Sequence, residues 1–271
     1  MAEAAVLLLE ILRFYRCSSA PEAFPIFVLL KYIMMHTVKY STLLPVLALF
    51  LSLQACVKGK GPVVSKTFEP GSFDRVDMAT AGEITVIHDG TDLVKVTSNE
   101  NIINALRINV SSGKLHIDAK PMKILQKYDV LNIEVHTSAK LRGLSTSASG
   151  NIRCTDCLDT QAELKTSASG GIEVTGIFDN LSAATSASGN ITLKGAATNA
   201  VYKTSASGNI FGFDCITQNT EARTSASGNI ETTVMQKLTG SISGSGNIRY
   251  KGDPSQINVD DSASGGVEKV N

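Results

Sequence analysis

The heptapeptide TSASGNI, at Thr224–Ile230, decides how this chain folds. The same seven letters stand at Thr146–Ile152, Thr185–Ile191 and Thr204–Ile210, and close variants stand at Thr166–Ile172, Ile242–Ile248 and Asp261–Val267. Successive copies are 18 to 20 residues apart. A fixed period of this length predicts a solenoid, in which each unit buries its apolar face against its neighbours. Helical solenoids usually have longer repeats, of about 33 residues or more, so the period favours β-structure.

An apolar residue stands two places after the first glycine of every copy: Ile152, Ile172, Ile191, Ile210, Ile230, Ile248 and Val267. One polar residue separates it from the next apolar position in several copies, which is the pattern of one face of a strand. At about 3.3 Å per extended residue, one period makes a loop of roughly 60 Å, which suits a β-helix rung of two or three short strands. Equivalent residues of successive rungs lie about 4.8 Å apart, so we expect the isoleucines to form one buried column.

The middle of the heptapeptide is expected to turn the chain. Asn or Gly follows the first glycine in all copies, and both tolerate a left-handed backbone, so we expect a left-handed corner. If Ala148 and its equivalents point inward, alternation places Ser147 and Ser149 outward and makes two columns of hydroxyl groups. The third position after the glycine carries opposite charges on neighbouring rungs, as in Arg153 and Glu173. Such pairs set the register more than they add stability.

The first 55 residues have the composition of a targeting segment rather than of a core. The stretch 35–55 (MHTVKYSTLLPVLALFLSLQA) has a basic start and an apolar run too short to span a membrane. With Cys56 it ends in LQAC, which resembles the lipobox of bacterial lipoproteins and implies that Cys56 carries a lipid that anchors the protein to a membrane. A transmembrane anchor is the alternative. With 35–55 as a signal segment, residues 1–34 are expected to be an upstream extension that is not used in the cell, and residues 56–67 a polar tether.

The remaining chain divides into a β-rich N-terminal part, 68–145, and the repeats, 146–271. Alternating apolar residues with turns at Asp89-Gly90 and Ser112-Gly113 predict hairpins or a meander, and 99–105 predicts a short helix or a loop. The composition is globular, with 43% hydrophobic residues and a formal net charge of zero over 271 residues. No basic patch or acidic run indicates a nucleic-acid partner.

Both parts together resemble the family named "putative auto-transporter adhesin, head GIN domain", which is common in Bacteroides-type bacteria. The resemblance runs from about Phe68 to the C-terminus and rests on FDRVDMATAGEITVIHDG, on KVTSNENIINALRINVSSGKLHID and on the recurring SASGNI. It implies an all-β fold of β-helix type in an exported, often lipid-anchored protein of the cell envelope. It implies no catalytic residues.

The repeated serines are expected to be structural rather than catalytic. A nucleophilic serine needs a base within hydrogen-bonding reach. The four histidines, His36, His88, His116 and His136, all lie outside the repeats. SASG also lacks the G-x-S-x-G elbow of hydrolases. We therefore expect no catalytic centre, and no residue set indicates a cofactor.

The cysteines and aspartates of the repeats leave several readings open. Cys154, Cys157 and Cys215 are one ligand short of a structural zinc site. They are small apolar residues of an inward column, or Cys154 and Cys157 form a local disulfide, or they serve metal or redox chemistry. Cys157 and Cys215 lie three rungs apart, roughly 14 Å, which is too far for a disulfide. Asp159 and Asp179 take the same place on adjacent rungs, where they form turns or, in an enzyme, a catalytic or calcium-binding pair.

Two classes of function remain. We expect a noncatalytic envelope protein, held in the outer membrane by its lipid, that presents a rigid β-solenoid for adhesion or for binding a glycan or protein ligand. The alternative is a carbohydrate-active β-helix enzyme, a polysaccharide lyase or hydrolase. Aromatic residues make up only 6% of the chain and Trp is absent, which argues against the aromatic-lined groove of such an enzyme. A more remote reading is a hydroxyl lattice that binds ice or a crystalline glycan.

Overall fold

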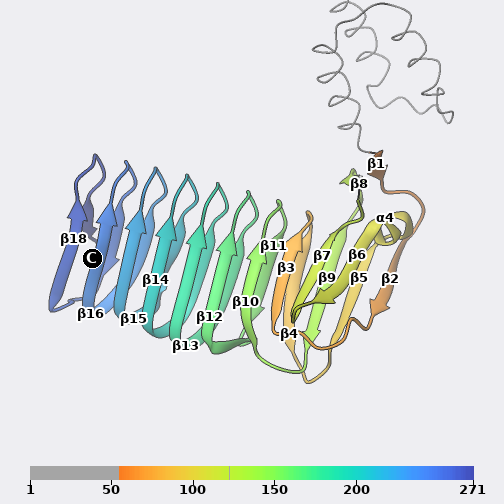
Figure 1. Cartoon of the computed structure of the whole chain (residues 1–271), viewed down its shortest axis with the longest axis horizontal. Helices are drawn as coiled ribbons and strands as arrows, with labels where there is room; N and C mark the ends of the chain where they lie inside the picture. Colours follow the sequence, from red (N-terminus) through yellow and green to blue (C-terminus); the bar gives the residue numbers. More distant parts are fainter. Residues whose placement is uncertain (1–54, 122) are drawn as a thin grey trace, which may run out of the picture. The chain divides into compact units, whose positions relative to one another are not determined.

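The structure, a computed structural model, describes residues 55–121 and 123–271. The expected upstream extension and all but the last residue of the expected signal segment lie outside these residues. The described chain is almost entirely β-structure and forms a stack of parallel rungs with antiparallel strands and a short helix at one end (Figure 1). No helix in this part of the chain is long and apolar enough to cross a membrane. The predicted fold class, an all-β parallel solenoid, is confirmed.

The strands of the N-terminal part are β1 (Ala55–Lys58), β2 (Val63–Phe68), β3 (Arg75–Ala79), β4 (Glu83–His88), β5 (Leu93–Asn99), β6 (Leu106–Ser111), β7 (Lys114–Ala119), β8 (Lys123–Gln126) and β9 (Leu131–Thr137), with helix α4 (Glu100–Ala105) between β5 and β6. The repeats form β10 (Leu141–Thr146), β11 (Asn151–Thr155), β12 (Leu158–Thr166), β13 (Ile172–Thr185), β14 (Ile191–Thr204), β15 (Ile210–Thr224), β16 (Ile230–Ile242), β17 (Ile248–Lys251), β18 (Gln256–Asp261) and β19 (Val267–Lys269).

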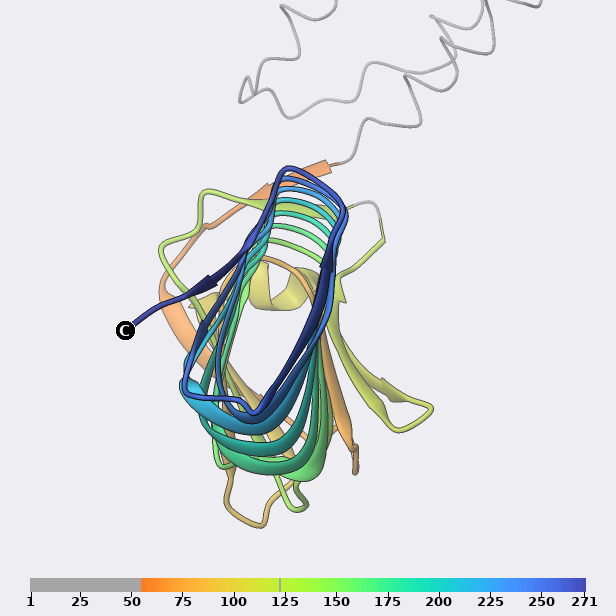
Figure 2. The same ribbon diagram turned by 90° about the vertical axis from the view of Figure 1, so that its left-hand side faces the viewer.

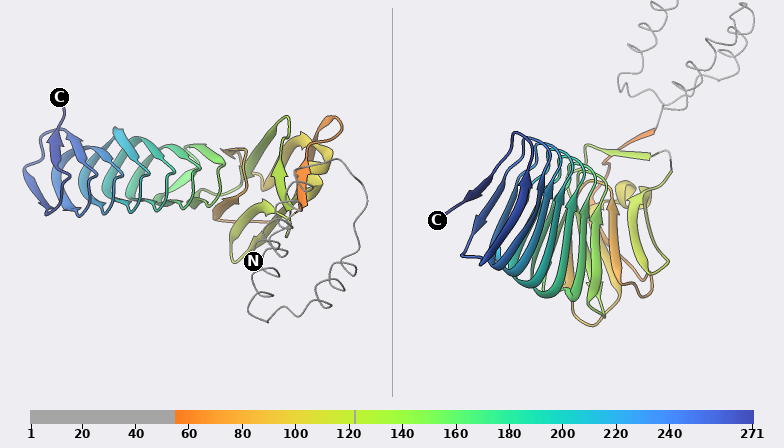
Figure 3. Two further views of the ribbon diagram at one scale, coloured as in Figure 1. Left: turned by 90° about the horizontal axis from the view of Figure 1, so that it is seen from above. Right: turned by 60° about the vertical axis from the view of Figure 1, so that its left-hand side comes forward.

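Each rung in the middle of the stack consists of one long strand. The strand begins after one corner, bends back along its length and ends before the next corner. β13, β14 and β15 each run from the isoleucine after one corner to the threonine before the next. Neighbours pair in parallel with like residues opposite each other, as Ile172 with Ile191 and Thr185 with Thr204. Seen along the stack, the rungs form a flattened ring (Figure 2). Seen from above, they stand side by side in a row (Figure 3).

The isoleucine column forms the core, as predicted. Its members pair rung to rung and are at most 2% exposed: Ile152, Ile172, Ile191, Ile210, Ile230 and Ile248. The charges at the next position also meet across rungs. Arg153 Nε lies 3.4 Å from Glu173 Oε2, and Arg249 Nη1 lies 3.1 Å from Glu231 Oε1. The ion pairs expected from the sequence are therefore confirmed.

The first glycine of the corner has a role that differs from the expected one. Among the described residues with positive φ, none is the first glycine of a copy or the Asn or Gly that follows it, where the left-handed backbone was expected. A Cβ added at Gly208 would instead lie 2.2 Å from the carbonyl oxygen of Gly189 on the neighbouring rung, and one at Gly228 would lie 2.2 Å from that of Gly208. The prediction of a left-handed corner is therefore wrong. Glycine is needed because successive corners stack backbone against backbone.

The asparagines after the glycine form a ladder instead of left-handed turns. The backbone N–H of Asn209 donates to Asn190 Oδ1 at 2.9 Å, and that of Asn229 donates to Asn209 Oδ1 at 2.9 Å. At the N-terminal end of the ladder, Asn151 Nδ2 donates to Glu83 Oε1 at 2.8 Å. Each side chain thus binds the next corner and fixes the register of the stack.

Threonine, rather than alanine, is the buried side chain of the corner. Thr146 and its equivalents at the ends of β12, β13, β14 and β15 are at most 2% exposed. Ala148, expected to point inward, is only half-buried, whereas the serines on either side of it are exposed, as expected. A buried hydroxyl needs a partner. Thr185 Oγ1 finds one in the carbonyl oxygen of Gly189, to which it donates at 2.8 Å.

The N-terminal part continues the parallel stack, so the expected boundary at residue 146 marks no break in the sheet. β3 pairs in parallel with β7 and β10, and β4 pairs in parallel with β9 and β11. β3 and β4 make a rung whose corner, 78–84 (MATAGEI), stands in place of TSASGNI. This rung lies between that of β7 and β9 and that of β10 and β11, although it precedes both in the sequence (Figure 1).

Only one of the two expected hairpins forms. β6 and β7 are antiparallel, with Ser111 opposite Lys114 across the turn at Ser112-Gly113. The strands on either side of Asp89-Gly90 do not pair with each other, because β9 lies between them and pairs with both. The prediction of a hairpin at this turn is therefore wrong. In a hairpin β5 would lie beside β4, but β9 lies there instead.

Antiparallel strands and helix α4 close the N-terminal end of the stack. β5 pairs with β9 and β2 with β5, while α4 buries Ile102 and Ile103. A solenoid needs such a cap because its last rung otherwise exposes its apolar columns. The segment 56–67 belongs largely to this region and is not a free tether. β1 pairs with β8, and Val64 of β2 packs against the core.

Candidate functional site

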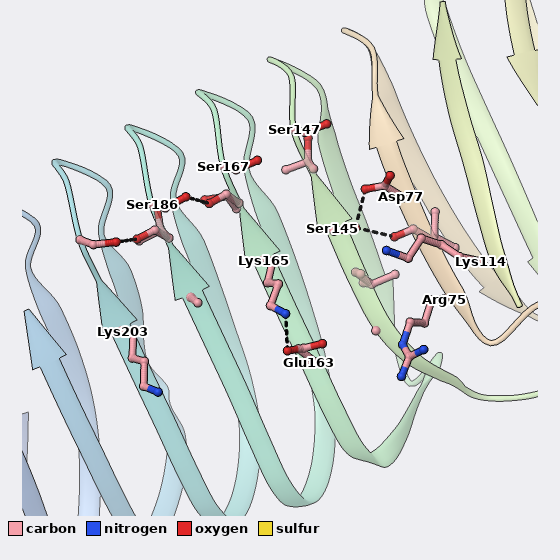
Figure 4. Close-up of a pocket in the computed structure, with 18 residues that line it drawn as sticks. Arg75, Asp77, Lys114, Ser145, Ser147, Glu163, Lys165, Ser167, Ser186 and Lys203 are labelled. Atoms are coloured by element: carbon pink, nitrogen blue, oxygen red, sulfur yellow. Dashed lines mark hydrogen bonds and ion pairs between the residues drawn. The ribbon is translucent and has the colours of Figure 1, made fainter. Parts of the chain in front are cut away.

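A polar groove crosses the outer face of the stack just before the corners. It has a volume of about 510 Å³ and is lined by residues of β3, β7, β10, β12, β13 and β14, together with the first serines of the corners (Figure 4). We define this polar groove by its charged residues: Arg75, Asp77, Lys114, Glu163, Lys165 and Lys203. Because it runs over several rungs, it offers an elongated surface rather than an enclosed cavity.

Two small residues line the groove between longer ones. Gly143 stands between Arg75 and Glu163 in the register of neighbouring strands, and Ala184 stands between Lys165 and Lys203. Ala184 leaves space between the long side chains of Lys165 and Lys203, whereas Arg75 packs over Gly143, where an added Cβ would lie 3.6 Å from Arg75 Cγ. Ala184 lies on the outer face because it alternates with the buried Ala183 and Thr185, whereas Gly143 is itself buried.

Positive charge exceeds negative charge in the groove. Lys165 Nζ lies 2.5 Å from Glu163 Oε1, so this pair is neutralised within the groove. In the described part of the chain, Arg75, Lys114 and Lys203 have no carboxylate within ion-pairing distance. These three cations remain available to an anionic partner.

A row of serine hydroxyls forms the upper border of the groove. Its members follow the buried threonine of successive rungs: Ser147, Ser167, Ser186 and Ser205. Ser186 Oγ and Ser205 Oγ each lie 3.5 Å from a backbone oxygen of the preceding rung, which is long for a hydrogen bond between oxygens. The hydroxyls can therefore bind a ligand as donors or acceptors, at intervals of about 4.8 Å.

A serine and an aspartate of the groove form a cluster with His116 beside it, but the order of the three side chains does not activate the serine. Ser145 Oγ donates to Asp77 Oδ1 at 2.6 Å, and His116 Nδ1 lies 3.2 Å from Asp77 Oδ2. In a hydrolase triad the histidine stands between the other two and takes the proton from serine. Here the aspartate stands between them, so the histidine has no contact through which it could act as the base.

Sequence reasoning found the serine row but missed most of the charges. Arg75, Asp77 and Lys114 come from the N-terminal part, which was expected to form a separate meander. Their place beside the repeats follows from the parallel pairing of β3 with β10 and β7. The available signal was MATAGEI at 78–84, whose glycine and isoleucine match those of TSASGNI.

The three cysteines of the repeats are all buried. Cys154 and Cys157 form a disulfide, with their Cα atoms 5.8 Å apart, which settles the question that the sequence left open. Cys215 is a free thiol, and its burial raises the pKa of the thiol. A buried thiol of raised pKa is a poor nucleophile. Cys56, the expected lipidation site, is a free and exposed cysteine in β1.

Asp159 and Asp179 do not face each other across adjacent rungs. The register places Gln161 opposite Asn180, so a pair between the two aspartates would be one residue out of step. Asp159 Oδ1 instead accepts a hydrogen bond of 2.6 Å from the backbone N–H of Thr160. No group of three or more His, Cys, Asp or Glu side chains suited to a metal ion occurs in the residues that the structure describes.

Known proteins share this architecture. A "putative adhesin" from Bacteroides fragilis superposes with a TM-score of 0.71, covering 79% of this chain and 100% of its own, at 18% sequence identity. A "putative lipid binding protein" from Parabacteroides distasonis gives a TM-score of 0.67, covering 80% of this chain and 100% of its own, at 26% identity. A "putative adhesin" from Parabacteroides merdae gives 0.64, with 80% and 99% coverage, at 20% identity.

No curated protein matches the chain. A family model does match it, over residues 72–254, which is more than half of the sequence and includes both the MATAGEI rung and most of the repeats. The chain therefore belongs to the family described as "Putative auto-transporter adhesin, head GIN domain".

Proposed function

We propose that this protein is a noncatalytic adhesin of the cell envelope that binds an extended polymer, such as a glycan, along the outer face of its solenoid. The polar groove carries this proposal. It crosses several rungs and offers charged side chains together with one serine hydroxyl group on each successive rung. A polymer with repeated polar groups can make one weak contact on each rung, and many weak contacts in a row give useful affinity.

The rigidity of the scaffold supports such binding. The buried isoleucine and threonine columns and the asparagine ladder hold each corner at a set distance from the next. The groove is therefore formed before a ligand arrives. Little conformational entropy is lost on binding, which favours affinity from a modest number of contacts.

We further propose that the protein is exported and held in the outer membrane by a lipid on Cys56. The disulfide between Cys154 and Cys157 supports export, since disulfides persist mainly in oxidising compartments. The exposed side chain of Cys56 at the start of β1 is accessible to modification. In a Gram-negative host, the chain should incorporate labelled fatty acid and a Cys56→Ala variant should not. Equal labelling of both would contradict lipidation at this residue.

A carbohydrate-active enzyme is the competing reading, and the groove offers it little support. The serine of the Ser145, Asp77 and His116 cluster lacks contact with a base. Glycosidases of the common type flank the scissile bond with two carboxyl groups. In the polar groove, one carboxylate is paired with a lysine and the other is held by a serine and a histidine.

The test is a panel of immobilised polysaccharides incubated with the purified full chain, with the heat-unfolded chain as the control. We expect retention on at least one polysaccharide and no release of sugar fragments. Failure to bind any glycan on the panel would refute the proposal. Fragment release that is lost in an Asp77→Asn variant would instead favour the enzyme.

A further inference from the structure

We infer that the polar groove takes an acidic polysaccharide, with the negative groups of the polymer at Arg75, Lys114 and Lys203 and the sugar hydroxyls at the serine row. This inference rests on the proposed function and names the chemical class of its ligand. Figure 4 shows the arrangement: the serines lie near the corners, and the cationic side chains extend over the strands below them.

The distribution of charge points to an anionic ligand. Arg75 and Lys114 are partners in the register of β3 and β7, so two cations lie on adjacent strands at one end of the groove. Lys203 lies at the other end, two rungs beyond the Lys165 and Glu163 pair, with Ala184 between. Strands are about 4.8 Å apart, so Lys165 and Lys203 are separated by roughly 10 Å along the stack. A polymer with negative groups along its length can therefore meet cations at both ends of the groove.

The same lining argues for a glycan rather than a nucleic acid. Non-specific binding of nucleic acid neutralises many phosphates with lysine and arginine, and single strands also stack their bases on aromatic rings. The residues that line the groove include no aromatic side chain, and two of them, Asp77 and Glu163, are acidic. Both side chains can accept hydrogen bonds from the hydroxyl groups that a polysaccharide presents along its whole length.

The excess of positive charge is local to this end of the stack. In the column of Lys203, the next residue is Arg223, which lies 2.6 Å from Glu221 on its own strand. The column then continues with Ser241 and Asp260. Within this column, the one cation without a carboxylate partner is therefore Lys203 in the groove, beside the space that Ala184 leaves for a ligand.

The experiment compares two polymers that differ only in charge. Polygalacturonate carries a carboxylate on each sugar, and its methyl ester is neutral on the same backbone. We expect the full chain to bind polygalacturonate more tightly than the ester, with an affinity that falls as salt is raised. Chondroitin sulfate is a third ligand, and its comparison with polygalacturonate tells whether the groove prefers sulfate or carboxylate.

Variants locate the binding to the groove. Arg75→Gln combined with Lys203→Gln should weaken polygalacturonate binding about tenfold, because two charge-assisted contacts are lost. Lys123→Gln, on the exposed strand β8, makes the same type of change elsewhere and should have little effect. Ala184→Glu adds a carboxylate between Lys165 and Lys203 and should abolish binding. The thermal unfolding of each variant shows that loss of binding is not loss of fold.

The outcomes separate the two proposals. Equal binding of the ester and the acid, unchanged by these variants, would overturn the acidic ligand and leave the adhesin function standing. Binding of the acid that is reduced as much by Lys123→Gln as by the groove variants would also overturn the inference, since the charge would then act from elsewhere. Binding of none of these polymers would overturn the acidic ligand, and the polysaccharide panel would then decide whether the proposed function survives.

Discussion

A Gly208→Ala variant should destabilise the solenoid although the added methyl group is small. The new Cβ would lie 2.2 Å from the carbonyl oxygen of Gly189, 2.3 Å from Thr185 Oγ1 and 2.9 Å from the carbonyl oxygen of Ala187. Ordinary contacts of this kind begin near 3.4 Å. The two rungs must therefore separate locally by about 1 Å, which sacrifices packing on both sides of the corner.

The loss can be estimated from the contacts that hold the corner. Gly208 N donates to the carbonyl oxygen of Ala187 at 2.7 Å, so the clash falls beside a hydrogen bond between the same two rungs. Overpacking of a well-packed site costs typically about 1–3 kcal/mol. For a folded unit of this size, each 1 kcal/mol lowers Tm by roughly 2–4 °C. We therefore expect a fall of several degrees.

Thermal and urea unfolding of three variants tests this reasoning. Ser207→Ala, one residue earlier and exposed, is the matched control and should stay close to the parent. Gly208→Asn separates the two explanations of the glycine. If the glycine served a left-handed turn, asparagine would largely replace it; if backbone contact decides, asparagine should be at least as harmful as alanine. A harmless Gly208→Ala, or a Gly208→Asn close to the parent, would refute the contact explanation.

Three further predictions concern stability. Ile210→Ala should lower the free energy of unfolding by about 2–5 kcal/mol, because it empties a place in a fully buried column; a loss no larger than that of an exposed alanine variant would contradict this. Lys194 holds the pKa of Glu173 below its usual value of 4.5, so the ion pair stabilises the fold above that pH and ceases to do so as the pH falls through the lowered pKa. Glu173→Gln should therefore be less stable than the parent at neutral pH and approach it in acid, whereas a constant difference across the pH range would exclude the pair as the cause. Reducing the Cys154 and Cys157 disulfide should cost about 2 kcal/mol, because it closes only a short loop, and a Cys154→Ala, Cys157→Ala variant should be insensitive to the reductant.

The repeat explains why so much of this fold could be predicted. Parallel strands that carry the same residues at the same positions have one register in which the isoleucines meet one another and the charges at the next position, such as Arg153 and Glu173, meet their opposites. That register buries the apolar column and satisfies the ion pair of Arg153 and Glu173 together. Alternation along each strand also places the serines of the corner outward. These features depend on contacts between equivalent residues, which the sequence displays directly.

The contacts inside the corner could not be read in this way. Glycine suits both a left-handed turn and a close backbone approach, and the letters SGN do not distinguish the two. The choice depends on how closely one corner lies on the next, as the contact between Gly208 and Gly189 shows. The same holds for threonine, whose buried role follows from the carbonyl oxygen that the corner turns toward it.

The sequence by itself determined the length of a rung, the residues of its core and the parallel stacking of successive rungs, because these features repeat along the chain. Only the tertiary structure decided the order of the rungs, which placed β3 between β7 and β10 and so brought Arg75 and Lys114 into the polar groove. The physical reason is that a rung is stabilised when its corner and strands match those of the neighbouring rung, whether or not the two rungs are adjacent in the chain. A diverged rung such as that of MATAGEI can therefore be inserted between later ones, provided that the antiparallel strands and α4 cover the apolar columns left at the end.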